Sequence, residues 1–137
     1  MPLTKTRALI ADLASATGSG ELQADDNGGF QLTIGADVTV LLYGGDDATL
    51  LVVLPVCPLP PQPDYATVAY LLGQNTMQSA ITPFQIGMDE GGGLILWARL
   101  PIAALDGETL AGLVDALADS VTQIRGELYP QAEAEAA

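Results

Sequence analysis

Cys57 is the only cysteine in the sequence and therefore its only soft nucleophile. A catalytic cysteine reacts as its thiolate, which enzymes usually obtain with the help of a neighbouring histidine. The 137 residues include no histidine, and Pro55 and Pro58 lie on either side of Cys57. We therefore interpret Cys57 as a buried or incidental thiol without a catalytic role. A single cysteine also forbids an intramolecular disulfide and is typical of a reducing compartment.

Acidic residues gather in short segments rich in glycine, where carboxylates could hold a cation or act as an acid–base pair. The segment Asp25-Asp26-Asn27-Gly28-Gly29 lacks the alternate ligand spacing and the later glutamate of an EF-hand calcium loop. Asp46-Asp47 and Asp89-Glu90 lie in equally short turns, where aspartate and glycine are ordinary turn residues. Carboxylates in turns are solvated by default, which also disfavours a glycosidase pair. We expect no catalytic residues, no metal site and no cofactor.

Two further motifs could bind anions. Gly18-Ser19-Gly20 follows a predicted helix instead of a strand, and the Gly-Lys-Ser/Thr motif of a phosphate-binding loop does not occur. Arg99 alternates with Trp97 along a predicted strand, so both side chains should lie on one face of it. An anion site at Arg99 is one interpretation, and stacking on Trp97 or pairing with a carboxylate is the commoner one. The sequence therefore predicts a protein that is not an enzyme.

The composition combines an apolar chain with charge of one sign. Asp and Glu number 17 against 4 Lys and Arg, the formal net charge is −13, and 49% of the residues are hydrophobic. Only 15% are charged, against roughly 25% in a typical soluble domain. So few cations disfavour nucleic acids and anionic membranes as partners. The longest apolar run, residues 50–57, is too short to span a membrane, and we expect a soluble cytoplasmic protein.

The apolar pattern predicts a single α+β domain over residues 1–130 and a disordered tail over residues 131–137. Alternating apolar residues between Gly and Asp turns predict antiparallel strands, and spacings of three and four residues predict helices that pack with the sheet. In chain order, the predicted elements are a helix over Thr4–Thr17, strands over residues 30–34, 38–43 and 50–56, a helix over residues 64–74, strands over residues 84–88 and 94–100, and a long helix from Asp106 to Pro130. The prolines of residues 55–63 predict an extended connector.

The strands carry more apolar surface than three helices can easily cover. Leu41 and Tyr43 lie opposite Val40 and Leu42 on one strand, and residues 50–54 are apolar throughout. A sheet covered on both faces within one chain is one explanation. We favour the other, in which a second subunit or a client protein covers part of this surface.

Several segments follow a recognisable pattern. Tyr70-Leu71-Leu72-Gly73-Gln74-Asn75 combines a leucine pair with an asparagine at the end of the middle helix. Phe84-Gln85-Ile86-Gly87-Met88-Asp89 leads into a glycine turn, and Leu94-Ile95-Leu96-Trp97-Ala98-Arg99-Leu100-Pro101 leads toward the long C-terminal helix. In the first half, Phe30-Gln31-Leu32-Thr33-Ile34 begins the meander. With this order of elements, the sequence resembles the class I type III secretion chaperones, the CesT/SycE-like family.

The resemblance implies a homodimer in the bacterial cytoplasm that serves virulence. Such a protein holds the extended N-terminal segment of a secreted effector against apolar patches, without ATP or catalysis, and keeps it soluble and competent for secretion. By matching the middle helix, the resemblance assigns dimerisation to Tyr65, Val68, Leu71 and Leu72. For effector binding we predict the apolar residues of the first helix and first strand, namely Leu9, Ile10, Leu13, Phe30, Leu32 and Ile34.

Two other classes of function stay open. The first is a regulatory or adaptor module that binds a folded protein partner, again without chemistry. The second is a hydrolase or metal-dependent enzyme with unfamiliar residues. Tight metal binding that is lost when Asp25, Asp46 and Asp89 are replaced would indicate the enzyme.

Overall fold

The structure, a computed structural model, describes residues 4–17, 29–34, 37–44, 48–76, 79, 81 and 83–130. The predicted tail over residues 131–137 lies outside them. The fold is α+β, and its elements are α1 (Thr4–Thr17), β1 (Gly29–Ile34), β2 (Val38–Gly44), β3 (Thr49–Pro58), α2 (Tyr65–Gly73), β4 (Gln85–Met88), β5 (Gly93–Pro101), a 3₁₀ turn η1 (Ile102–Ala104) and α3 (Gly107–Leu128). None of these helices is both long and apolar enough to cross a membrane.

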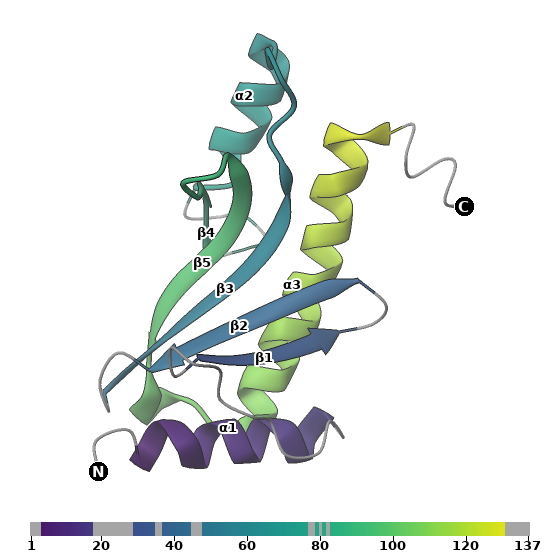
Figure 1. Cartoon of the computed structure of the whole chain (residues 1–137). Helices are drawn as coiled ribbons and strands as arrows, with labels where there is room; N and C mark the ends of the chain where they lie inside the picture. The colour runs from purple at the N-terminus through teal and green to yellow at the C-terminus, as the bar shows by residue number, and fades with distance from the viewer. Residues whose placement is uncertain are drawn as a thin grey trace.

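The five strands form one antiparallel sheet in the order β1-β2-β3-β5-β4. As predicted, β1, β2 and β3 form a meander and β4 and β5 form a hairpin. Pairing between β3 and β5 joins these two parts over the full length of both strands, from Thr49 opposite Pro101 to Pro58 opposite Gly93. Figure 1 shows how β3 and β5 twist together along the sheet while β1 and β2 diverge from them.

β3 continues through Pro55 and ends at Pro58, so the prediction of a connector beginning at residue 55 was wrong for its first residues. Proline lacks an amide hydrogen and normally interrupts a central strand. Here β2 pairs only with residues 50–53 of β3, and beyond them β5 is the one strand that pairs with β3 in the described part of the chain. The register also shifts between Pro55 and Cys57, a local bulge that accommodates the missing donor.

Side chains from the end of α3 replace β2 along this part of β3. Arg125 Nε donates a hydrogen bond to the Val56 carbonyl at 2.6 Å, and an Arg125 Nη lies 3.3 Å from Asp37 Oδ2. The Tyr129 hydroxyl donates to the Pro58 carbonyl at 2.7 Å. The two hydrogen bonds give the carbonyl groups of Val56 and Pro58 side-chain partners where β2 no longer pairs with β3. All three contacts fix the end of α3 to β3 and to the turn before β2.

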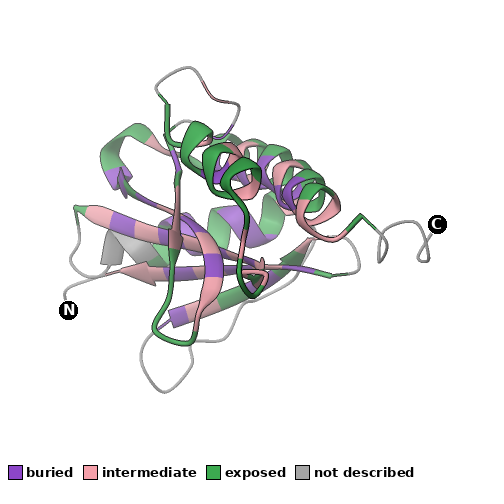
Figure 2. Cartoon of the chain, turned by 90° about the horizontal axis from the view of Figure 1, so that it is seen from above, coloured by how far each residue is buried: buried purple, intermediate pink, exposed green. Residues whose placement is uncertain are grey.

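The core lies between α3 and one face of the sheet. α3 begins after Asp106, whose carboxylate accepts a hydrogen bond from Thr109 N at 2.7 Å. This bond favours the charged carboxylate and lowers the pKa of Asp106. Along β2, β3 and most of β5, buried residues alternate with half-buried ones, as the colours along the ribbon show in Figure 2. The largest fully buried side chains come from the sheet, from α3, from α1 and from the segment before β4, and they include Leu13, Leu42, Leu50, Leu54, Ile81, Leu96, Leu110, Leu117 and Ile124.

α1 packs across the beginning of α3 at one end of the molecule (Figure 1). Gly107 lies at this crossing, where an added Cβ atom would be 2.4 Å from the backbone carbonyl carbon of Asp12. Backbone atoms cannot move aside as a flexible side chain can. The close approach of the two helices therefore requires glycine at this position.

We predict that Gly107→Ala lowers the free energy of unfolding by about 2 kcal/mol, because the helices must separate to admit the methyl group. Gly112→Ala, on an exposed side of the same helix, is the matched control, since nothing lies within 4 Å of its added Cβ atom. The control should be neutral or stabilising by up to about 1 kcal/mol, because alanine favours the helix. Urea unfolding measures both variants, and equal stabilities would contradict the close crossing.

Candidate functional site

Cys57 lies half-buried on β3 and packs against the core. Burial raises the pKa of its thiol, and the nearby charge of Arg125 lowers it by a smaller amount. The net shift is upward, so the thiol stays protonated at neutral pH. Cys57 is thus only partly buried, so of the two predicted environments, a buried thiol and an incidental one, the structure does not show a fully buried one.

Asp89 stabilises the turn between β4 and β5. Its Oδ1 accepts hydrogen bonds from the backbone N–H groups of Gly91 and Gly93, each at 2.9 Å. The carboxylate therefore serves the turn, as its sequence context predicted. Among the described residues, no group of three or more His, Cys, Asp or Glu side chains could hold a metal ion. Residues 25–28 and 46–47, the other acidic turns of the sequence, lie outside this part of the chain.

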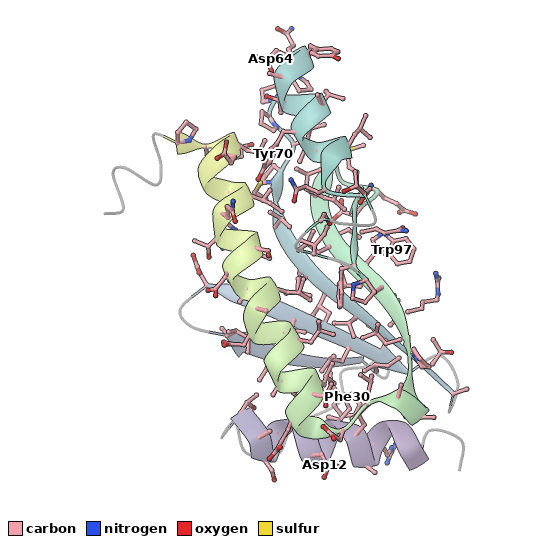
Figure 3. All side chains as sticks on the ribbon, turned by 180° about the vertical axis from the view of Figure 1, so that it is seen from behind. Asp12, Phe30, Asp64, Tyr70 and Trp97 are labelled. Atoms are coloured by element: carbon pink, nitrogen blue, oxygen red, sulfur yellow. The ribbon has the colours of Figure 1, made fainter. Side chains whose placement is uncertain are left out.

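The two faces of the sheet differ in what covers them. α3 contacts β2 and β3 from one side, and in Figures 1 and 3 α2 lies beyond one end of the sheet. No described helix lies over the opposite side, which we call the open face. It carries six large apolar side chains that are all half-buried, namely Leu41, Tyr43, Leu51, Val53, Ile95 and Trp97. The strand register sets them side by side, with Val53 between Leu41 and Trp97.

Trp97 is the largest side chain of the open face and points away from α3 (Figure 3). It extends toward β4, where a Cβ atom on Gly87 would lie 3.2 Å from Trp97 Nε1. The Arg99 guanidinium stacks on the indole, with its Cζ atom 5.4 Å from the ring centroid. The shared face of the two residues is thus confirmed, and stacking accounts for Arg99.

α2 lies at one end of the molecule (Figure 1), and its exposed side chains form a second apolar surface. Asp64 begins the helix as predicted, because its carboxylate accepts a hydrogen bond from a backbone N–H of the first turn at 2.8 Å, which lowers its pKa. Tyr65, Val68 and Leu72 share one side of α2 and are 89%, 40% and 65% exposed. We call these three residues the helix surface. Leu71 is only 8% exposed and belongs to the core, unlike the other residues predicted for dimerisation.

Four of the residues predicted for effector binding are core residues in the single chain. Leu9, Ile10 and Leu13 of α1 are at most 5% exposed, and Leu32 of β1 is 4% exposed. The apolar stripe of α1 packs into the same hydrophobic cluster as α3 and the sheet, which removes it from the surface. A client could reach these side chains only if α1 moved away from the sheet.

Phe30 and Ile34, the other two residues predicted for effector binding, are half-buried at the rim of this core. Ile34 lines a hollow of about 440 Å³ between three elements, together with Ala16 of α1 and Ala111 of α3. The structure therefore brings these two side chains closer to solvent than the other four. It does not bring the six together as one exposed surface.

From the sequence we expected a second subunit or a client to cover part of the strand surface, but none of the six residues predicted for effector binding lies on the open face. Its signal was present, since Leu41, Tyr43 and residues 50–54 make strands that are apolar on both sides. The pattern could not indicate which side the helices cover, because that depends on how β3 pairs with β5 and where α3 returns.

The sequence matches the Tir chaperone protein (CesT) family over residues 8–125. This range extends from the first half of α1 to the last turn of α3 and includes the open face and the helix surface. The chain belongs to this family. Its resemblance to the CesT-like secretion chaperones is thereby confirmed. A comparison with curated protein sequences gives no match.

Several solved structures have the same fold. A chain in the ExoU–SpcU complex from the type III secretion system of Pseudomonas aeruginosa has 20% identity and a TM-score of 0.74, covering 89% of this chain and 98% of that one. A chain in the structure of the Yersinia pestis type III secretion chaperone SycH with a fragment of YscM2 has 20% identity and a TM-score of 0.70. The match covers 86% of this chain and 98% of that one. A chain in the HopA1–SchA chaperone–effector complex has 19% identity and a TM-score of 0.69. The match covers 88% of this chain and 93% of that one. At these identities the likeness shows a shared α+β fold.

Proposed function

We propose that the chain is a type III secretion chaperone that acts in the bacterial cytoplasm. As a homodimer it binds the extended N-terminal segment of an effector and keeps that segment soluble and competent for secretion. The observation that carries the proposal is the open face, a continuous apolar surface on a sheet that helices cover from one side. Membership of the Tir chaperone family supports it, as does the similarity to a chaperone–effector complex. The chain acts by binding, without catalysis.

An extended client segment suits the shape of the open face. Leu41, Val53 and Trp97 form a row across β2, β3 and β5. A segment that lies on this row can bury alternate side chains against it, because successive side chains of an extended chain point to opposite sides. A disordered client loses conformational entropy when it binds, so the contact has to be large. The rings of Tyr43 and Trp97 offer rigid anchors for such a contact.

The helix surface is the contact that we assign to the homodimer. Tyr65, Val68 and Leu72 are three of the four exposed large hydrophobic side chains of the described residues. A two-fold axis would pack this surface against its own copy and remove all three side chains of each subunit from water. Leu71, which the core already buries, is left out of the assignment.

We predict that Leu72→Asp converts the homodimer into a folded monomer, because the contact would otherwise bury an unpaired charge. The leucine is 65% exposed in the single chain, so the monomer should keep its fold. Ala66→Asp is the matched control, since Ala66 is exposed on α2 outside the helix surface. Sedimentation equilibrium and circular dichroism measure the outcome. A wild-type chain that stays monomeric at micromolar concentration would contradict the homodimer.

We predict that Val53→Asp weakens client binding on the order of 100-fold, because the charge would be desolvated beneath the bound segment. The client is first identified by mass spectrometry after co-purification from the native bacterium, and its protected segment is then used in calorimetric titrations. Gln123→Asp places the same charge on an exposed side of α3 and is the control. Equal affinities of the two variants would contradict binding at the open face.

Limited proteolysis of the complex between the chain and its co-purified client distinguishes a chaperone from an adaptor that binds a folded partner. A chaperone leaves the bound segment extended, so limited proteolysis should trim the client to a short protected stretch. An adaptor should instead protect a compact, globular partner.

A further inference from the structure

β4 forms one edge of the sheet. An edge strand exposes backbone donors and acceptors that can pair with a strand of another molecule. β4 is four residues long, and among the described strands only β5 pairs with it. Its last residue, Met88, is 59% exposed, so an apolar side chain accompanies this edge. Edges of this kind favour unwanted association unless they are protected.

Asn75 occupies the outer edge of β4 at Ile86. The backbone N–H of Ile86 donates a hydrogen bond to Asn75 Oδ1 at 2.7 Å, and Asn75 Nδ2 donates to the Ile86 carbonyl at 3.2 Å. A residue of a neighbouring antiparallel strand would make the same pair of bonds. The side-chain amide can replace it because it carries an acceptor and a donor in one plane, as a peptide group does.

The turn at the end of α2 holds Asn75 in position. The Asn75 N–H donates to the Leu72 carbonyl at 3.0 Å, and the Gln74 N–H donates to the Leu71 carbonyl at 3.1 Å. The Ser79 hydroxyl donates to the Gln74 carbonyl at 2.7 Å. These bonds fix the backbone that carries the amide, so the contact with Ile86 is made by a positioned side chain.

We propose that Asn75 blocks the outer edge of β4, so that this strand cannot pair with a strand of another molecule. Along a strand, every second residue directs its backbone groups to the same side. With Ile86 occupied, Met88 is the one remaining residue of β4 that faces outward, which is too little for a ladder. Two copies are thereby directed to associate through the side chains of α2. This last step rests on the proposed homodimer, whereas the block on β4 does not.

Amide hydrogen exchange of Ile86, followed by NMR in the full chain, tests the contact. In the wild type the Ile86 amide should be protected, and in Asn75→Ala it should exchange about tenfold faster, as expected for the loss of a hydrogen bond. Asn75→Asp keeps an acceptor for the Ile86 N–H but sets a carboxylate oxygen against the Ile86 carbonyl oxygen, so it should retain the protection only in part. Gln74→Ala removes a bond to the Tyr70 carbonyl within α2 and is the control for that turn. An Ile86 amide that exchanges freely in the wild type would overturn the proposal, even if the variants fail to fold.

Sedimentation velocity over a range of concentrations tests the consequence for association. Asn75→Ala should form assemblies larger than those of the wild type, growing with concentration, while Gln74→Ala should behave as the wild type. If Ile86 exchanges faster in Asn75→Ala but its assemblies match the wild type, Asn75 only ties the loop to β4 and the proposal is wrong. A monomeric wild type would contradict the homodimer, yet the difference between it and Asn75→Ala would still decide the role of Asn75.

Discussion

The pairing of β3 with β5 is the constraint on which the rest of the structure depends. It joins the N-terminal meander to the C-terminal hairpin and fixes Val53 opposite Trp97, which assembles the open face from both halves of the chain. Because η1 and α3 follow β5 directly, the same pairing determines where the long helix returns to the sheet. α3 then covers one face, and the opposite face keeps its apolar side chains half-exposed.

Charge of one sign complements this exposed apolar surface. A net charge of −13 makes copies of the chain repel one another at a distance, which discourages indiscriminate association. Asp115 and Asp119 lie exposed on α3, outside its buried stripe. At short range, individual side chains protect the surface against unwanted association. The Asn75 amide, which bonds to the backbone at the edge of β4, is an example. A protein that exposes apolar surface for binding needs both kinds of protection.

The elements and their order could be predicted from sequence because they follow local patterns. The helix caps Asp64 and Asp106, the turn at Asp89 and the common face of Trp97 and Arg99 all depend on residues close in the chain. Predictions were weaker where contacts between residues far apart in the chain determine the structure.

Distant contacts explain what the sequence could not reveal. β3 continues through Pro55 because β2 has already left it and Arg125 bonds to the next carbonyl. Leu13 is buried because α1 meets α3, and Asn75 bonds to a strand that begins ten residues later. The excess of apolar strand surface was visible in the sequence, but the face that stays open was not.

Trp97, the only tryptophan of the chain, tests the central claim directly because it lies on the open face beside Arg99. Its fluorescence can be followed while the chain is saturated with a client segment that contains no tryptophan. If the segment binds the open face, the emission should shift to shorter wavelength and acrylamide should quench it less, because the indole leaves water. An emission spectrum and a quenching constant that are both unchanged at saturation would contradict the claim.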